Sequence, residues 1–291
     1  MDNKIKQFER HLREEEKAES TINKYLQDVK EFYRWLDVNS IHNITKEELL
    51  DYKEHLKNSN LKVTSINSKI SSLNSYLIYS ENETLKLKVI KCQKTLFGSK
   101  EKVLTKNEYK RLYEASKNNK KVKYIIETIV RTGIRVSELQ YITYESLMKG
   151  KVEINNKGKI RTVLIPRKLC IKLLDYYRSN RKVEQNYSDK SKNIGELCEY
   201  VFITKNGNHI DRKQIWKMLK NLADKAGLIK EKVFPHNLRH LFAHEFYKST
   251  HDIVKLASIL GHSSIETTRI YTKETEDECR IDMDKLEFVI N

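Results

Sequence analysis

The sequence predicts a mainly α-helical protein in which one short β-hairpin interrupts the helices. The chain of 291 residues contains only two prolines and eight glycines, so long stretches lack the residues that break helices. Its apolar residues recur mostly at intervals of three and four, which is the spacing of one helical face. With 38% apolar residues, the chain can build one large domain or two ordinary ones.

The N-terminal part of the chain is expected to form a compact module of four short helices. Apolar residues follow helical spacing in residues 4–15 and again in residues 20–36. Thr45, followed three residues later by Glu48, predicts a capping box at the start of a third helix. A fourth amphipathic helix is expected to start at Thr64. Helices of this number and length suffice for a small bundle.

A basic linker, residues 91–101, is expected to join this module, residues 1–90, to a second domain over residues 102–291. Helical periodicity fades between residues 81 and 103, where six lysines accompany a Gly-Ser pair. Such a linker either lies along a phosphate backbone or is a solvated connector, and the sequence leaves both interpretations open.

The second domain is expected to begin with two helices and a turn that carries an arginine. Thr105 and Glu108 predict another capping box, and the apolar residues of 121–131 predict a buried helix. The turn that follows, TGIRVSEL, places Arg135 at a helix start and Glu138 three residues later. A carboxylate at this spacing can hold the guanidinium in place, although such pairs are also common on protein surfaces.

A β-hairpin is expected next. Polar and apolar residues alternate in residues 152–154 and 161–165, and the sequence NNKGK over residues 155–159 is typical of a turn. A lysine in such a turn faces solvent more often than it takes part in chemistry. Residues 167–193 are then expected to be helical, and residues 200–204 to form a short strand.

The charge of the chain indicates a polyanionic partner. Lys and Arg number 56 against 40 Asp and Glu, which gives a net charge of +16, and +13 of this lies after residue 100. Nucleic acid or an anionic membrane surface would attract such a chain. No apolar run approaches the ~20 residues of a membrane helix, and the start MDNKIKQFER lacks a secretory signal, so we expect a cytoplasmic protein. Four widely spaced cysteines without a CxxC pair indicate reduced thiols.

The residues best suited to chemistry lie near the C-terminus. Pro235 suits the first turn of a helix that places His236 and Arg239 on one face. His262 follows a glycine, and Tyr271 comes nine residues later. This segment therefore supplies an anion-binding pair, an acid–base candidate and a phenol nucleophile.

Two plainer interpretations compete with this one. His236, His240 and His244 repeat every four residues and could form a zinc-binding face. No Asp, Glu or Cys completes the set at a familiar spacing, and Arg239 would repel a cation, so we expect no metal site. Because the chain has sixteen tyrosines, Tyr271 without the arginine motifs would be interpreted as a core aromatic.

Five motifs follow one another along almost the whole chain. They are FERHLREEEKAESTINKYLQDVKEFYRWL (residues 8–36), TGIRVSEL (132–139), NKGKIR (156–161), HNLRH (236–240) and LGHSSIETTRIYT (260–272). Together they resemble the tyrosine recombinases of the phage integrase family, and most of all the compact Xer-type and small transposon integrases. The resemblance implies a SAM-like four-helix core-binding domain that binds DNA, followed by a mixed, mostly helical catalytic domain.

The resemblance also implies a set of site residues. They are the clamping arginines Arg135 and Arg239, the histidines His236 and His262, the hairpin lysine Lys157, the nucleophile Tyr271 and the supporting Glu138. No cofactor and no metal are implied. In one departure, the family hairpin usually reads GKG, one variable residue, then K-x-R, whereas NKGKIR is one residue shorter. Lys159 therefore stays an alternative to Lys157.

These residue types suit the cleavage of a phosphodiester. Two guanidinium groups can hold the non-bridging oxygens bidentately and do not lose their charge. A phenol with a pKa of about 10 must lose its proton as it attacks, and the departing 5′ hydroxyl must gain one. His236 could assist the first transfer and Lys157 the second, while His262 would bind the phosphate and orient Tyr271. A 3′-phosphotyrosyl ester stores the bond energy, so rejoining needs no ATP.

The expected activity is site-specific recombination of double-stranded DNA through a Holliday junction. The resemblance implies a homotetramer on two DNA sites, with or without a paralogous recombinase, and no membrane partner. Integration, excision and Xer-like resolution share this chemistry. A type IB topoisomerase acting as a monomer and a DNA-binding relative that does not cut are the alternatives. The apolar residues of 276–291 are expected to dock on a neighbouring subunit, with folding back in cis as the alternative.

Overall fold

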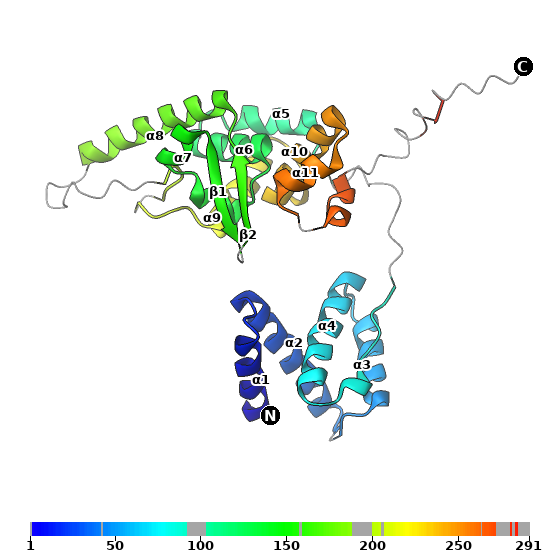
Figure 1. The fold of residues 1–291 in the computed structure, drawn as a ribbon. Coiled ribbons are helices and arrows are strands. Elements are labelled where there is room, and N and C mark those ends of the chain that lie inside the picture. The colour runs from blue at the N-terminus through cyan, green and yellow to red at the C-terminus, as the bar shows by residue number, and fades with distance from the viewer. Residues whose placement is uncertain are drawn as a thin grey trace, which may run out of the picture. The chain divides into compact units, whose positions relative to one another are not determined.

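In a computed structural model, the chain forms two compact units, Met1–Lys94 and Thr95–Asn291 (Figure 1). The structure describes residues 2–41, 43–91, 103–156, 159–187, 200–204, 207–262, 264–271, 280 and 283–284. Nearly all of the expected linker and most of the C-terminal segment lie outside the described residues. Each unit contains its own hydrophobic core, so each is described by itself.

The first unit is a bundle of four helices. They are α1 (Asp2–Glu14), α2 (Glu19–Val38), α3 (Lys46–Asn58) and α4 (Val63–Tyr79), followed by the short 3₁₀ helix η1 (Glu83–Leu85) (Figure 1). Their apolar faces share one core, in which the rings of Phe8 and Tyr76 meet edge-on with centroids 5.2 Å apart. The predicted capping box is present, because the Thr45 N–H donates to the Glu48 carboxylate at 3.1 Å. The predicted four-helix module is confirmed.

The second unit is mostly helical and contains one small sheet (Figure 1). Among the described residues of this unit, four helices precede the sheet: α5 (Lys106–Ala115), α6 (Lys120–Thr132), η3 (Val136–Tyr141) and α7 (Tyr144–Lys149). The helices after it are α8 (Arg167–Tyr187), α9 (Arg212–Lys225), η4 (Lys230–Lys232), α10 (Pro235–Thr250), α11 (Ile253–Leu260), η5 (Ile265–Thr267) and η6 (Arg269–Tyr271). Helices α6 and α10 pack against each other in the middle of the unit. The predicted mainly helical fold is confirmed.

The sheet is an antiparallel hairpin of β1 (Lys151–Asn156) and β2 (Lys159–Leu164). Both strands reach further toward the turn than the alternating pattern predicted, since Asn156 pairs with Lys159. Main-chain hydrogen bonds can extend a ladder past the last apolar side chain. One face of the hairpin is buried in the core, whereas Ile160 and Leu164 on the other face are exposed. The predicted hairpin is confirmed with a shorter turn.

The strand predicted over residues 200–204 is wrong. This segment forms only two isolated bridges, one from Tyr200 to Thr143 and one from Ile203 to His209. Three consecutive apolar residues, Val201 to Ile203, are all buried, so the segment enters the core without the alternation of a half-buried strand. Apolar content alone therefore misled the prediction. The helix predicted over residues 167–193 is present as far as Tyr187, and its remainder lies outside the described residues.

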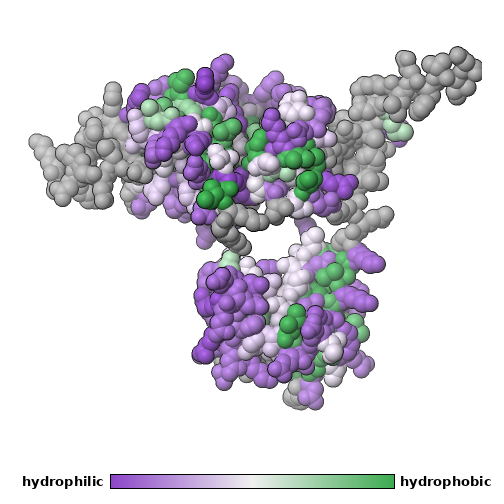
Figure 2. Space-filling view, in the orientation of Figure 1, coloured by the Kyte–Doolittle hydropathy of each residue, from purple (hydrophilic) through white to green (hydrophobic). Residues whose placement is uncertain are grey.

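Hydrophilic residues cover most of the visible surface of both units, and hydrophobic residues form separate spots among them (Figure 2). Among the residues that the structure describes, no helix has both the length and the apolar character needed to cross a membrane.

Candidate active site

The structure brings together four of the residues singled out in the sequence, from segments far apart in the chain. Arg135 precedes η3, Arg239 lies in α10, His262 follows α11, and Tyr271 ends η6. His236, in the first turn of α10, lies at the edge of this cluster with an exposed side chain. Lys157 falls outside the described residues, as does nearly all of the segment after Tyr271.

Arg135 is held by the carboxylate that the sequence placed beside it. The Arg135 backbone N–H donates to Glu138 Oε2 at 2.8 Å, and its Nη1 donates to Oε1 at 2.9 Å. Glu138 is only 4% exposed. The preceding turn requires a glycine: Gly133 has φ +63°, and a Cβ there would lie 2.4 Å from Phe242 Cδ1. The close approach of α6 to α10 at Gly133 thus fixes the position of the chain that leads to Arg135.

Arg239 is a buried cation, 3% exposed, on the helix that packs against α6. Its Nη1 donates to the Gly133 carbonyl, and its Nη2 donates to the Leu260 carbonyl at 2.7 Å. Burial, and then the positive charges of Arg135 and Arg161, lower the pKa of Arg239 to about 10. The guanidinium therefore keeps its charge at neutral pH.

Arg161 joins the cluster from strand β2, and the sequence reasoning missed it. Its Nη1 donates to the Ile259 carbonyl at 2.7 Å, and its Nη2 pairs with Glu138 Oε2. One signal could have revealed it. Arg161 lies two residues before Val163 and four before Ile165, and both of these are buried. Because residues two apart on a strand share a face, the strand period places all three side chains on the inward face. Burial, together with Arg135, lowers the pKa of Arg161 despite the opposing effect of Glu138.

The C-terminal end of α11 is the point where the three arginines meet. Its last carbonyls lack partners within the helix and carry partial negative charge. Arg161 donates to the carbonyl of Ile259, Arg239 to that of Leu260 and Arg135, at 3.4 Å, to that of Gly261. Three cationic side chains from three elements thus hold three successive carbonyls. This arrangement fixes the backbone immediately before His262.

His262 is neutral and has a defined tautomer. Its Nε2 lies 3.3 Å from Arg239 Nη2, which can only donate, so Nε2 accepts. Nδ1 then carries the proton and donates to Thr268 Oγ1 at 2.9 Å. Burial, followed by the charges of Arg239, Arg135 and Arg161, lowers the pKa of His262 to about 4. At neutral pH the ring offers a lone pair toward the arginines.

Tyr271 is buried, with an exposed fraction of 1%. Its ring meets His240 edge-on at a centroid distance of 4.7 Å and stacks near His262 at 6.0 Å. Leu256 and Leu260 of α11 complete the apolar part of its surroundings. Burial, and then the neighbouring His236 and His244, lower the pKa of His240 to about 4, so the ring beside the phenol is neutral. The phenol therefore lies next to the arginine cluster but is closed to solvent.

His236 also favours the neutral form. Partial desolvation, and then the positive charges of Arg239 and Arg135, lower its pKa. A neutral imidazole at the exposed edge of the cluster can accept a proton, which an imidazolium cannot do.

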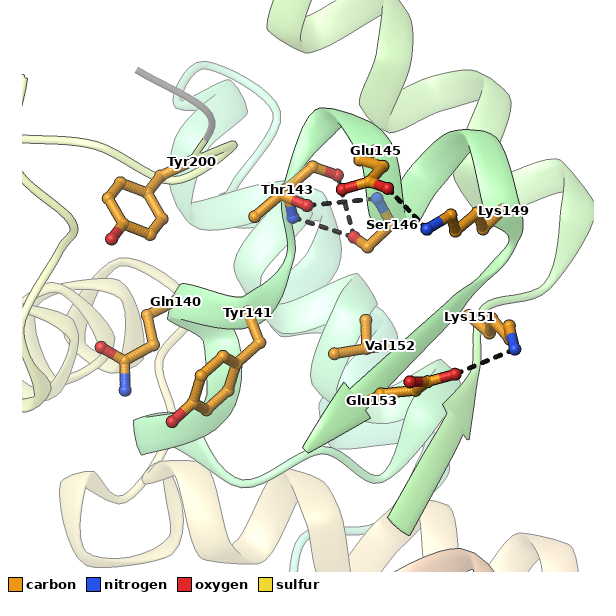
Figure 3. A pocket seen from close by; sticks show the side chains of 10 residues that line it. All are labelled: Gln140, Tyr141, Thr143, Glu145, Ser146, Lys149, Lys151, Val152, Glu153 and Tyr200. Atoms are coloured by element: carbon orange, nitrogen blue, oxygen red, sulfur yellow. Dashed lines mark hydrogen bonds and ion pairs between the residues drawn. The ribbon is translucent and has the colours of Figure 1, made fainter. Parts of the chain in front are cut away.

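An open pocket elsewhere on this unit contains none of these residues (Figure 3). It is lined by Gln140, Tyr141, Thr143, Glu145, Ser146, Lys149, Lys151, Val152, Glu153 and Tyr200. Its charged side chains pair with one another, Lys149 with Glu145 and Lys151 with Glu153. Among these described lining residues, the charged groups do not converge on a common point. The arginine cluster is therefore the candidate active site.

Replacing Glu138 by Gln is expected to remove an acid-sensitive part of the stability. Burial raises the pKa of Glu138. The Arg135 N–H, the Arg161 charge and the Arg135 side chain together lower it by more, so the net shift is downward. A carboxylate with a lowered folded-state pKa stabilises the fold above the unfolded-state pKa, and this contribution is lost as pH falls through the folded-state value. Because two arginines would lose their counter-charge, Glu138→Gln should unfold about 3 kcal/mol more easily at neutral pH.

Urea unfolding measured from neutral pH down to about pH 3 checks this prediction. The free energy of unfolding should fall more steeply with acid in the unsubstituted protein than in Glu138→Gln. Glu145→Gln is the control, because Glu145 is exposed in its pair with Lys149. Parallel curves for the unsubstituted protein and Glu138→Gln would contradict the prediction.

Comparison with known proteins identifies relatives of both units. The model of the phage integrase family matches residues 102–278, and that of the phage integrase N-terminal SAM-like domain matches residues 5–83. The TnP I resolvase of Bacillus thuringiensis is 29% identical over 97% of this chain and 99% of its own. The tyrosine recombinase XerA of Pyrococcus furiosus is 30% identical over 93% of this chain and 89% of its own. A crystal structure of a lambda integrase dimer bound to a COC′ core site matches the fold, with a TM-score of 0.71, 18% identity and coverage of 95% and 96% of the two chains.

These matches define the class of protein: the chain is a tyrosine-type recombinase, an enzyme that breaks and rejoins DNA strands. It belongs to the phage integrase family, and Xer recombinases are among its relatives. The fold class, the family and the activity predicted from the sequence are confirmed.

Proposed function

We propose that the chain recombines specific double-stranded DNA sites in the cytoplasm through a 3′-phosphotyrosyl intermediate at Tyr271 and a Holliday junction. The observation that supports this most is that Arg135, Arg239 and His262 meet at the C-terminal end of α11. Tyr271 of η6 lies beside them. Cationic donors next to a phenol suit an attack on a phosphodiester, where negative charge grows on the phosphate oxygens.

In this proposal the two arginines bind the scissile phosphate. Glu138 holds the Arg135 guanidinium and α11 holds that of Arg239, so both are organised before DNA arrives. Donors that need no rearrangement at the moment of reaction stabilise a transition state most strongly. Lys157 lies outside the described residues and is proposed as the acid that protonates the departing 5′ oxygen, with Lys159 as the alternative.

The histidines take different roles. His262 lies against Arg239 and carries its proton on Nδ1, so its Nε2 can turn from the arginine to accept from the phenol. In the other tautomer the Nε2–H would instead donate to a phosphate oxygen. His236 is exposed and favours the neutral form, and it is therefore proposed to accept the proton from Tyr271. Tyr271, which is 1% exposed, must leave its place between His240 and His262 before it can reach a phosphate.

Duplex DNA is the proposed partner. The net charge of +16 favours phosphate contacts and salt-sensitive binding. The lambda integrase structure is a dimer on DNA, and its match to this fold supports the same kind of substrate here. A homotetramer on two sites, with or without a paralogous recombinase, belongs to the proposal, as does docking of residues 276–291 on the next subunit.

Two experiments, carried out one after the other, test the proposal. DNA that is covalently trapped by the protein in cells is first sequenced, which identifies the target site. Plasmids carrying two, one or no copies of this site are then incubated with purified protein. We expect strand exchange only between paired sites, because each strand must be rejoined to a partner strand. Relaxation of the plasmid without sites would instead favour a topoisomerase, and binding without any trapping would favour a DNA-binding relative that does not cut.

A further inference from the structure

The chain that follows the four-helix bundle is fixed to it although it forms neither helix nor strand. Residues 86–90, the anchored segment, come directly after η1, and four side chains of the bundle hold their backbone. Lys91, the first residue of the expected basic linker, follows at once. We propose that this stretch is a phosphate-contacting surface of the first unit, which presents Lys88 and Lys91 to a DNA duplex. The inference rests on the proposed function, in which duplex DNA is the partner.

Two asparagines of α4 pair with the backbone of the anchored segment as a neighbouring strand would. Asn67 Nδ2 donates to the Ile90 carbonyl at 2.9 Å, and its Oδ1 accepts from the Ile90 N–H at 2.8 Å. Asn74 makes the same two contacts with Leu87, both at 2.8 Å. The spacings match, because seven helical residues rise about 10.5 Å and three extended residues span about 10 Å. The two pairs of hydrogen bonds therefore hold the segment extended and in one register.

Two lysines of α3, also seven residues apart, hold the same segment from a second helix. Lys46 Nζ donates to the Lys86 carbonyl at 2.5 Å. Lys53 Nζ donates to the Lys88 carbonyl at 2.7 Å. Leu87 between them is 4% exposed and belongs to the core of the bundle. Because this backbone is already ordered, binding of a ligand to its side chains does not have to order it.

The anchoring gathers cations that lack a counter-charge. The two α3 lysines place their ammonium groups on the segment, and the side chains of Lys88 and Lys91 are exposed beside them. Glu83 pairs with Lys86, but none of these four lysines forms an ion pair within the part of the chain that the structure describes. Like charges brought close together repel one another, and an anion bound to the same surface removes this repulsion. A solvated connector needs no such cations, because water satisfies its carbonyls.

The salt dependence of binding measures phosphate contacts directly. Each ammonium that neutralises a phosphate adds about 0.9 to the slope of log affinity against log salt. We expect the full chain with Lys88→Gln and Lys91→Gln to bind duplex DNA with a slope smaller by about 1.8. Its affinity should then fall about twelvefold less between about 50 and 200 mM salt. Fluorescence anisotropy with a labelled random-sequence duplex is sufficient, because phosphate contacts carry no sequence information.

Lys149→Gln combined with Lys151→Gln is the matched control for the loss of two charges. These lysines lie in the other unit, and each already pairs with a glutamate, Lys149 with Glu145 and Lys151 with Glu153. A paired ammonium has less charge to offer a phosphate. The slope of this variant should match that of the unsubstituted protein.

Asn67 and Asn74 are positioning residues in this inference, because they act through the lysines that the segment presents. With Asn67→Ala and Asn74→Ala, DNA must order the segment, so the affinity should fall. Adding Lys88→Gln and Lys91→Gln to that variant should then lower the slope by less than about 0.9. A bundle that is only less stable would give a different result, since its folded molecules would keep the full lysine effect.

Asn39→Ala is the control for the asparagine variants. Its Nδ2 donates to the Trp35 carbonyl at the end of α2 and not to the anchored segment, so the lysine effect should persist in full. Thermal melting identifies a double asparagine variant that does not fold. Asn67→Ala alone, which keeps the two hydrogen bonds of Asn74 to Leu87, then takes its place.

An unchanged slope with Lys88→Gln and Lys91→Gln would overturn the inference and show that the segment is a solvated connector. An undiminished lysine effect in the asparagine variant would overturn the positioning role. Failure of the proposed function looks different, because the protein would then bind duplex DNA with the expected slopes but never trap a DNA strand covalently.

Discussion

Replacing Tyr271 by Phe is expected to abolish covalent trapping of DNA. The substitution removes the attacking oxygen, so cleavage should fall by at least about 10⁴-fold, the scale on which loss of a nucleophile is felt. Phenylalanine keeps the ring contacts with His240 and His262 and the packing on α11, so the fold should be retained. Gel electrophoresis of the protein with a labelled, nicked duplex of the target site measures the trapped species directly.

Tyr247→Phe is the matched control for this experiment. Tyr247 packs against the same small hydrophobic cluster as Tyr271 and stands beside His251, but it lies on the last turns of α10. Its variant should trap DNA as the unsubstituted protein does. Covalent trapping of DNA by Tyr271→Phe would show that Tyr271 is not the nucleophile and that another residue attacks the DNA.

Replacing Arg239 by Lys is expected to slow cleavage about 10²- to 10³-fold, the usual effect of removing one preorganised donor from a transition state. The guanidinium donates to the carbonyls of Gly133 and Leu260 while it lies beside His262, and one ammonium cannot reach all three. Binding of the duplex should change far less, because the charge and the other phosphate contacts remain. Single-turnover cleavage and a filter-binding titration separate the two effects.

Arg269→Lys controls for the change of arginine to lysine in general. Arg269 lies in η6 close to Tyr271 in the sequence, is exposed, and pairs with Glu266 on the surface. Its cleavage rate should stay within about twofold, as for most exposed ion pairs. A rate for Arg239→Lys within about fivefold of the unsubstituted protein would show that Arg239 is not a clamp.

Much of the fold could be predicted because its signals are local. Capping boxes such as Thr105 with Glu108 depend on residues three apart, and the structure contains this one, with Thr105 N–H donating to Glu108 at 2.8 Å. Helical spacing of apolar residues predicted the bundle, and alternation predicted the hairpin. The strand prediction for residues 200–204 failed because three successive apolar residues show no alternation. Their burial depends on the shape of the core around them.

In the candidate site, too, local contacts could be predicted and contacts between distant segments could not. Arg135 and Glu138 were paired in the prediction because their spacing is local. Arg161 was missed, since its partners Glu138 and Ile259 are distant in sequence and only the packing of β2 on α11 brings them together. The burial of Tyr271 could not be predicted either, because it results from how η6 folds onto α10 and α11.

If Tyr271 is the nucleophile, as proposed, its burial also bears on how the protein avoids cleaving DNA that is not its target. A basic chain spends most of its time on sequences that are not its target, and a permanently exposed phenol beside two arginines would nick them. With 1% of its surface exposed, Tyr271, as the proposed nucleophile, would be withheld from such encounters. If the released state were populated one time in a hundred, accidental cleavage would fall about a hundredfold, while a target complex that favours release would recover the full rate. Fidelity toward the genome would then depend on access to the phenol as much as on recognition of the site.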